Sequence, residues 1–476
     1  MDGPRYIRDQ HGAGIVHLGL GAFHKAHQAA YTDDALAASG GDWRIIGVSL
    51  RSEQPSKDLA PQDGLYTLIT RDGGGMNARV IGSLAQAIAL PHHRKMVLNA
   101  LCAPTTRIVS MTVTEKGYGI DRQNGEVDLS HPAIKHDLAV PGEPWGAAGL
   151  LAWALGQRKS MNIPPFTILC CDNLPNNGKM IRNLLVSFAR HTSPGLADFI
   201  AAEVAFPSTM VDRITPSTTD ATLDLAERLI GYRDNAAVTA EPFRQWVIED
   251  QFPTGRPDWE AGGAIFTEDV SPYEEMKLRM LNGAHSLLAY AGFVCGLEMV
   301  RDVMTKPTLV ALIERHLHAA SATLRPVDSI DFDNYARDII SRFSNPNLAH
   351  KTHQIAMDGS QKMPQRIFAP AAHAFQHGTP LGTFAFATAA WLRYTFGRTE
   401  AGKRYDIRDP LLKSDRPAPK TAEDMSRRLS TNYDLLPPPL RSNHVWESAV
   451  TSRLTIMMND GIMMAAAQEL AGSIEH

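Results

Sequence analysis

Hydrophobic positions follow two different patterns along the chain. In the first half, short runs rich in β-branched residues alternate with helix-like stretches; the runs lie at 15–18, 44–50, 107–113 and 165–170. Such alternation is typical of a largely parallel, doubly wound sheet. From residue 273 onward the pattern is mostly helical, with helices predicted at 274–297, 306–321, 331–343, 380–396 and 453–470.

The change of pattern predicts a domain boundary near 265–275, after Gly262 and Gly263. With 476 residues, the chain is long enough for two or three domains. We therefore expect an α/β domain over 1–270 and a mainly α-helical domain over 271–476.

A glycine turn follows the first predicted strand, where 15–18 leads directly into Gly19-Leu20-Gly21-Ala22-Phe23-His24. Strand, glycine turn and helix is the order that a dinucleotide site needs. The first glycine permits the tight turn, and the second lets the backbone approach the pyrophosphate. His24 takes the third glycine position, so the fingerprint is incomplete, and an ordinary turn is the alternative.

An acidic residue, Glu53, follows the second predicted strand. A carboxylate there can bind the adenosine ribose and repel a 2′-phosphate, although Glu53 lies beyond the usual spacing of about 20 residues. Arg51 would instead favour a phosphate. On this balance we favour NAD over NADP as the cofactor.

Three polar residues, Lys277, Asn282 and His285, begin the predicted helix at 274–297. At about 100° per residue they span an arc of about 140°, so one side of a helix could present all three. A lysine of lowered pKa can take a proton from an alcohol, an amide can hold the oxyanion, and an imidazole can bind a neighbouring hydroxyl. The alternative is a surface lysine and asparagine with a structural histidine. However, the apolar stretch after His285 predicts a buried helix, in which polar groups need partners or a function.

Polar residues also follow other predicted strands. Asn173 lies where α/β proteins place ligand contacts; it could be a second oxyanion donor or part of an Asn-rich turn. Asp212, in a possible strand at 210–216, could contact the cofactor or pair with Arg213. Thr114 follows the strand at 107–113 and could border the nicotinamide.

In the helical half, Lys362 and Arg366 could bind hydroxyl or carboxylate groups, or could belong to a solvated loop.

Composition argues against several classes of protein. The net charge is −4, and no basic tract indicates binding to nucleic acid or an anionic membrane. No apolar run reaches the roughly 20 residues that span a bilayer, and the first residues do not resemble a signal peptide. The four cysteines form no C-x2-C pair, which argues against disulfides and structural zinc and favours the cytoplasm. For the oligomeric state, the sequence fits a monomer and a weak dimer equally well.

Four motifs together resemble the polyol-specific long-chain dehydrogenases, the mannitol 2-dehydrogenase family. They are G-L-G-A-F-H at 19–24, C-D-N-L-P-x-N-G at 171–178, M-V-D-R-I-T-P at 210–216 and Y-E-E-M-K-x4-N-x2-H at 273–285. The resemblance covers nearly the whole chain. It implies a Rossmann-type N-terminal domain, a mainly helical C-terminal domain, an active site between them and no metal.

The resemblance also implies roles for individual residues. Lys277 matches the general base, and His285 matches a histidine that orients the substrate. The other matches are an amide pair that holds the substrate oxygen (Asn173 and Asn282), a proton-relaying carboxylate (Glu274), a residue near the nicotinamide (Asp212) and a ribose-binding acid (Glu53). The predicted cofactor site comprises Asp212 and Glu53 together with Gly19, Gly21, Ala22, Phe23 and Thr114. The family's aspartate beside the ribose-binding acid is Gln54 here, which weakens the selection for NAD.

The segment 354–366 bears on the substrate. Mannitol dehydrogenases tend to have an arginine where this chain has Gln354, and the segment looks more like fructuronate reductases, which bind a keto sugar acid. Lys362 and Arg366 are then the candidate cations for its carboxylate.

We therefore expect an NAD-dependent, metal-independent secondary-alcohol dehydrogenase for D-mannonate/D-fructuronate. D-mannitol/D-fructose is the alternative substrate pair. A catalytically inactive NAD(H)-sensing protein is a hypothesis from another class, which the complete set of polar residues argues against. A zinc-dependent alcohol dehydrogenase lacks the ligand spacing.

Overall fold

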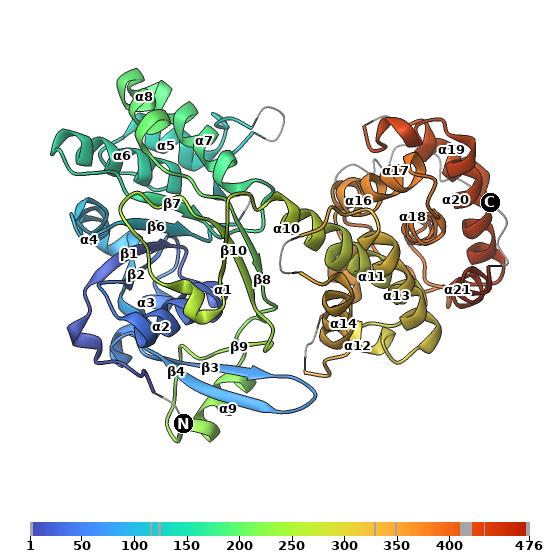
Figure 1. Ribbon diagram of the computed structural model, residues 1–476, viewed down its shortest axis with the longest axis horizontal. Coiled ribbons are helices and arrows are strands. Elements are labelled where there is room, and N and C mark those ends of the chain that lie inside the picture. Colours follow the sequence, from blue (N-terminus) through green and yellow to red (C-terminus); the bar gives the residue numbers. More distant parts are fainter. Residues whose placement is uncertain are drawn as a thin grey trace. The chain divides into compact units, whose positions relative to one another are not determined.

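The computed structural model describes residues 3–114, 117–121, 125–327, 330–347, 350–409, 421–432 and 434–472. The chain divides into two compact units, Met1–Ser271 and Pro272–His476. Figure 1 shows that the labelled strands belong to the first unit and that the second is built from helices.

Five parallel strands form the main sheet of the first unit, in the order β5-β2-β1-β6-β7. These strands are β1 (Ala13–Leu18), β2 (Arg44–Ser49), β5 (Leu84–Ala89), β6 (Ile108–Met111) and β7 (Thr167–Cys170). The order reverses between β1 and β6, and α/β proteins bind ligands at the carboxyl ends of the strands at such a switch point. The predicted doubly wound sheet is confirmed, with strands in all four of the predicted runs.

Strand residues of this sheet alternate between two hydrophobic cores. Val16, Val109 and Ile168 pack into one core, whereas Ile15, Ile108 and Leu169 pack into the other. Successive residues of a strand point to opposite faces of the sheet, so a strand covered on both faces needs apolar residues at every position. This explains the continuous apolar runs in the sequence.

Two smaller sheets complete the first unit, in the orders β11-β10-β8 and β4-β3-β9. Their strands are β3 (Tyr66–Arg71), β4 (Met76–Ile81), β8 (Thr209–Asp212), β9 (Val238–Ala240), β10 (Gln245–Glu249) and β11 (Ile265–Thr267). The possible strand at 210–216 is therefore β8, but it pairs with β10 outside the main sheet.

Helices connect the strands of the first unit. They are α1 (Ala22–Ala26), α2 (Gln28–Ser39), α3 (Gln54–Leu59), α4 (Leu90–Cys102), α5 (Pro132–Ala139), α6 (Ala147–Ser160), α7 (Asn177–Thr192), α8 (Pro194–Glu203) and α9 (Asp220–Ile230).

The second unit packs its helices around α11 and α18. From the boundary onward the helices are α10 (Ser271–Met276), α11 (Gly283–Val294), α12 (Val300–Val303), α13 (Pro307–Ser321), α14 (Phe332–Phe343), α15 (Thr352–Ala356), α16 (Gly359–Met363), α17 (Ala369–Gln376), α18 (Gly382–Tyr394), α19 (Ala422–Ser430), α20 (His444–Asn459) and α21 (Ile462–Ala471). Every residue of α11 except Phe293 is buried, as predicted for the apolar stretch after His285.

Two of the predicted helices are interrupted. The prediction of one helix over 453–470 is wrong, because Gly461, with φ of 89°, separates α20 from α21. The prediction of one regular helix over 274–297 is wrong as well, because a π-helical turn at Lys277–Asn282 separates α10 from α11.

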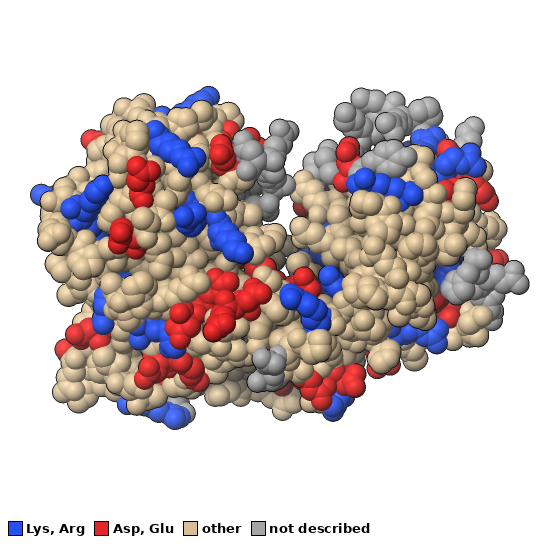
Figure 2. Space-filling model, turned by 45° about the horizontal axis from the view of Figure 1, so that its top comes forward, with Lys and Arg blue, Asp and Glu red and all other residues tan. Residues whose placement is uncertain are grey.

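Lys and Arg are interspersed with Asp and Glu on the face of the molecule that Figure 2 shows. In the part of the chain that the structure describes, no helix combines the length and the apolar character that crossing a bilayer requires.

Candidate functional site

The glycine turn lies at the switch point of the main sheet. The Gly19 and Leu20 amides donate to the Val48 carbonyl oxygen at 2.8 and 3.1 Å, which ties the turn to β2. Gly19 has φ of 108°, and a Cβ there would lie 2.0 Å from the Thr112 carbonyl oxygen, so only glycine fits. A Cβ at Gly21 would meet only the Gly19 oxygen, at 3.8 Å. The turn is therefore tight on its inner side and has room on its outer side.

His24, at the third position of the fingerprint, packs underneath this turn. Its ring stacks on His17 with a centroid distance of 3.5 Å. His17 Nδ1 hydrogen-bonds Ser110 Oγ at 2.8 Å, and Nε2 hydrogen-bonds Thr112 Oγ1 at 2.9 Å. Burial lowers the pKa of His17 to about 3 and that of His24 well below its usual range. Two neutral rings thus fill the space below the turn, a role for His17 that the sequence did not reveal.

The C-D-N-L-P-x-N-G motif joins three strand ends. Asp172 Oδ2 accepts hydrogen bonds from the Val113 amide at 2.7 Å and the Tyr118 hydroxyl at 2.6 Å. Asn177 accepts from the Thr209 amide and donates to the Thr209 carbonyl oxygen, both at 2.9 Å. Asn173 lies between these two residues and is exposed. Only Asn173 was predicted from this motif; the partly buried Asp172 and the buried Asn177, which hold the turn, were missed.

Thr114, the candidate neighbour of the nicotinamide, has a left-handed backbone with φ of 72°. Its amide donates to Asp172 Oδ2 at 3.3 Å. A threonine in this region costs about 1–3 kcal/mol and persists only where the surrounding structure imposes it, and such residues gather at functional sites. Asp172 therefore shapes the segment after β6 as well as its own turn.

Glu53 is a charged carboxylate at the start of α3. Its Oε2 lies 2.8 Å from Lys57 Nζ and 3.7 Å from His92 Nε2. The hydrogen bond from Lys57 lowers the pKa of Glu53. The Gln54 amide donates to Asp58 Oδ1 at 2.7 Å and so bonds within its own helix.

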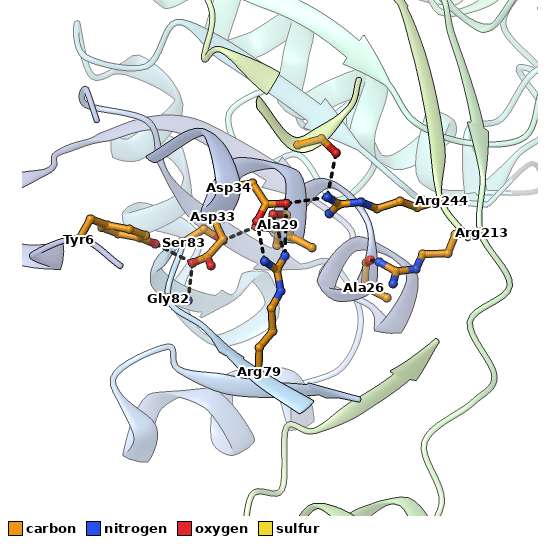
Figure 3. A network of polar contacts seen from close by, with 12 residues as sticks. Tyr6, Ala26, Ala29, Asp33, Asp34, Arg79, Gly82, Ser83, Arg213 and Arg244 are labelled. Carbon is orange, nitrogen blue, oxygen red and sulfur yellow. Dashed lines mark hydrogen bonds and ion pairs between the residues drawn. The ribbon is translucent and has the colours of Figure 1, made fainter. Parts of the chain in front are cut away.

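Asp212 is buried at the end of β8, and the next residue anchors the first helix. Arg213 donates to the Glu241 carbonyl oxygen from Nε at 3.1 Å and from Nη2 at 3.0 Å, and its Nη1 bonds the carbonyl of Ala26, which ends α1 (Figure 3).

Figure 3 also shows how α2 is held. Arg244 Nη2 donates to Asp34 at 2.7 Å, and Arg79 bonds the same carboxylate. Asp33 accepts from Tyr6 at 2.7 Å and from the Gly82 amide at 2.8 Å. These contacts fix the helices that follow the glycine turn.

In the second unit, Lys277 opens the π turn, Asn282 closes it, and His285 lies in the first turn of α11. The prediction of about 100° per residue is therefore wrong across this segment, because a π turn bonds i to i+5. Such turns within α-helices are frequent at functional sites. Glu274 lies three positions before Lys277 on α10 and is partly buried.

Two donors of this segment are buried without a partner. Asn282 Nδ2 and His285 Nε2 make no hydrogen bond to any of the residues that the structure describes. The His285 ring lies 4.3 Å from that of Phe343 and 5.4 Å from that of His350. Burial, together with the nearby His350 and cationic side chains, holds the pKa of His285 well below its usual range. A neutral ring and an amide that both lack partners indicate a place for a polar ligand.

Lys362 and Arg366 lie on helices, so the solvated-loop alternative is wrong. Lys362, on α16, donates from Nζ to the carbonyl oxygens of Met357 at 2.6 Å and Ile355 at 3.3 Å. Arg366 lies in a second π turn, Pro364–Phe368, and its Nη1 donates to Ser286 Oγ at 3.2 Å. Burial lowers the pKa of Arg366 to about 10 and also lowers that of Lys362. Among the described residues, neither cation forms an ion pair with a carboxylate, although the charges of Asp358 and Asp409 act to raise the pKa of Lys362.

Models of two protein domains match most of this sequence. The mannitol dehydrogenase Rossmann domain matches residues 13–261, and the mannitol dehydrogenase C-terminal domain matches residues 269–454.

Individual relatives match over nearly as much of the chain. "Uncharacterized oxidoreductase YeiQ" of Escherichia coli (strain K12) is 43% identical over 410 residues, covering 86% of this chain and 84% of the relative. D-mannonate oxidoreductase of the same organism is 43% identical over 410 residues, covering 84% and 83%. The structure of Pseudomonas fluorescens mannitol 2-dehydrogenase in a ternary complex with NAD and D-mannitol has a TM-score of 0.84 at 37% identity and covers 99% of this chain and 96% of that one. The chain is thus an oxidoreductase that belongs to the mannitol dehydrogenase family.

Proposed function

We propose that this protein is an NAD-dependent dehydrogenase that interconverts D-mannonate and D-fructuronate. The observation that carries the proposal is that Arg366 has no carboxylate partner among the described residues, whereas Lys362 interacts electrostatically with Asp358 and Asp409. A partly buried cation is costly without an anion, and arginine binds carboxylates in a bidentate way. A sugar acid supplies that anion, whereas a neutral polyol does not.

The surroundings of His285 also support a preference of the site for an anionic substrate. The groups that lower its pKa beside burial are His350, Arg342, Arg366 and Lys277, all of which are cations or potential cations. Such a group of side chains attracts an anionic ligand. The relative named D-mannonate oxidoreductase, at 43% identity, agrees with a hexonate as that ligand.

The proposed chemistry uses the donors of the first π turn. Lys277 takes the proton of the substrate hydroxyl, and Glu274 passes it to solvent. Asn282 donates from Nδ2 to the developing alkoxide, which gives this unpartnered amide its hydrogen bond, and Asn173 provides the second amide. His285, neutral because its pKa is lowered, binds a neighbouring hydroxyl and orients the substrate.

The glycine turn fits a dinucleotide by its shape. Gly19, Gly21, Ala22 and Phe23 provide a backbone with an open outer side for a pyrophosphate. Glu53 keeps its negative charge and so favours a ribose hydroxyl over a 2′-phosphate. Thr114 and Asp212 are the candidates beside the nicotinamide. When bound, NAD supplies the acceptor for the hydride that leaves the carbinol carbon.

D-mannitol 2-dehydrogenase is the second candidate function. The solved relative with a TM-score of 0.84 contains NAD and D-mannitol, so this architecture accommodates a neutral polyol.

Oxidation of NADH in the presence of D-fructuronate or D-fructose, at equal concentrations, separates the two candidates. We expect faster turnover of D-fructuronate, and Arg366→Ala should abolish that preference by raising KM for the acid. Lys351→Ala removes an exposed cation nearby in the sequence and should leave the preference intact. Faster turnover of D-fructose by the wild type would favour the mannitol alternative.

A further inference from the structure

The two π turns of the second unit meet at one buried position. Arg366 Nη1, from the second π turn, lies 3.5 Å from the carbonyl oxygen of Asn282, which ends the first. A Cβ at Gly283 would lie 3.1 Å from the Arg366 carbonyl oxygen, so a glycine keeps the two backbones close. The arginine proposed to hold the carboxylate therefore contacts the backbone of the residue whose side-chain amide is proposed to hold the alkoxide.

Ser286 lies at this junction, on α11, and is fully buried. Its Oγ donates to the Asn282 carbonyl oxygen at 3.0 Å and accepts from Arg366 Nη1 at 3.2 Å. The Ser286 hydroxyl thus donates its single proton to the backbone of the first π turn. Through a lone pair it accepts a hydrogen bond from the guanidinium of the second π turn. Nothing in the sequence pattern distinguished Ser286 from the apolar residues around it.

We propose that Ser286 is a positioning residue that orients Arg366 toward the substrate carboxylate and ties it to the backbone of Asn282. The proposal rests on the proposed function, since it assigns Arg366 to a carboxylate. With Nη1 held by Ser286, Arg366 Nε and Nη2 make no hydrogen bond to the described residues and remain for a bidentate contact. The Ser286 hydroxyl would then help to position both Arg366, which binds the acid, and Asn282, which donates to the alkoxide.

A structural hydroxyl of the same unit makes the same bond to the preceding turn as Ser286 does, but it contacts no arginine. Thr388, on the buried helix α18, donates from Oγ1 to the Phe384 carbonyl oxygen at 2.8 Å, the common bond to the preceding turn of a helix. Thr388→Val removes this bond from an equally buried site that carries no arginine. It is therefore a matched control for Ser286→Ala.

The test is a double-mutant cycle with D-mannonate and D-mannitol as substrates. Ser286→Ala should raise KM for D-mannonate by about tenfold, the value of one hydrogen bond to a charged group, with a smaller change in kcat. KM for D-mannitol should hardly change, and Thr388→Val should alter neither. In an Arg366→Ala background, Ser286→Ala should have no further effect on KM, because it acts through the arginine.

The outcomes distinguish this inference from the proposed function. If the wild type uses D-mannonate well but Ser286→Ala and Arg366→Ala raise KM additively, or Thr388→Val matches Ser286→Ala, the positioning role is wrong and the substrate proposal stands. If the wild type prefers D-mannitol, the substrate proposal fails and this inference fails with it.

Discussion

Two regions of the molecule, the strand ends beside the glycine turn and the first π turn, treat their polar side chains in opposite ways. Around the glycine turn of the first unit, His17, Asp172 and Asn177 direct their polar atoms to the strand ends and to neighbouring side chains. In the second unit, Asn282 and His285 each keep a buried donor without a partner among the described residues. The side chains at the strand ends therefore shape a backbone, whereas those of the π turn and of His285 keep a buried nitrogen for a ligand.

This difference predicts where a substitution should act. Polar groups that satisfy each other stabilise the fold, so their loss should appear first in the free energy of unfolding. Donors held without partners cost stability, so their loss should appear in turnover and leave the fold intact.

The largest effect on turnover should come from Lys277→Ala. Loss of a general base typically costs about 10²–10⁴-fold in rate, and we expect kcat to fall into the upper part of that range. NADH affinity, followed by fluorescence, should stay within twofold of the wild type, roughly 0.4 kcal/mol. Lys306→Ala, at an exposed lysine of the same unit, is the control. Turnover close to the wild-type value would refute the role of Lys277.

Asp172→Ala should mainly lower stability. It leaves the Val113 amide and the Tyr118 hydroxyl without their acceptor, which should cost about 3 kcal/mol in the free energy of unfolding measured with urea. Asp198→Ala, at an exposed carboxylate of α8, should be close to neutral. Equal stabilities of the two variants would contradict the shaping role of Asp172.

Gly19→Ala should affect both the fold and the cofactor. The added Cβ lies 2.0 Å from the Thr112 carbonyl oxygen at φ of 108°, which should cost about 1–3 kcal/mol of stability and displace the turn. Titration with NADH should show at least tenfold weaker binding, about 1.4 kcal/mol. Gly195→Ala places a Cβ in open space and should change neither quantity. Unchanged NADH affinity in Gly19→Ala would show that this turn does not take part in cofactor binding.

Acid should weaken the first unit through its buried histidines. Burial lowers the pKa of His17 and of His27 from 6.5 to about 3, so between these values the unfolded chain binds protons that the folded chain does not. The free energy of unfolding should therefore fall as the pH drops below 6.5, by up to about 1.4 kcal/mol per pH unit for each histidine, and should level off near pH 3.

Urea unfolding at pH 7, 6 and 5 measures this slope. His27→Gln should reduce it by up to about 1.4 kcal/mol per pH unit, since it removes one titrating group. A slope that is the same in wild type and variant would show that His27 does not titrate on unfolding.

The parts of the fold that could be predicted depend on short-range patterns. The strands of the main sheet were visible because both faces are covered, which makes 15–18 and 165–170 continuously apolar. The smaller sheets were mostly missed, since β4 is largely exposed and β8 finds its partner β10 far along the chain. The break at Gly461 was missed although Asn459, Asp460 and Gly461 form a turn signal between the two apolar stretches.

For the candidate site, the sequence named residues whose roles remain predictions, and it did not reveal their contacts. Lys277, Asn282, His285, Lys362 and Arg366 could be named from motifs, yet the π turns that carry them leave no mark in the apolar pattern. Ser286 and His17 were overlooked, because their role depends on neighbours from distant segments. Long-range packing, rather than residue type, decides which polar groups stay available for a ligand.

The π turn at Lys277–Asn282 can be viewed as a helix that contains one residue too many. Removing one residue from a helix rotates everything before it by about 100° relative to everything after it. A chain shortened by Leu281 would keep Lys277, Asn282 and His285 but would turn Lys277 by about 100° relative to the other two. The spacing of the functional groups is thus set by a count of residues, and a one-residue deletion here would do more harm than many substitutions.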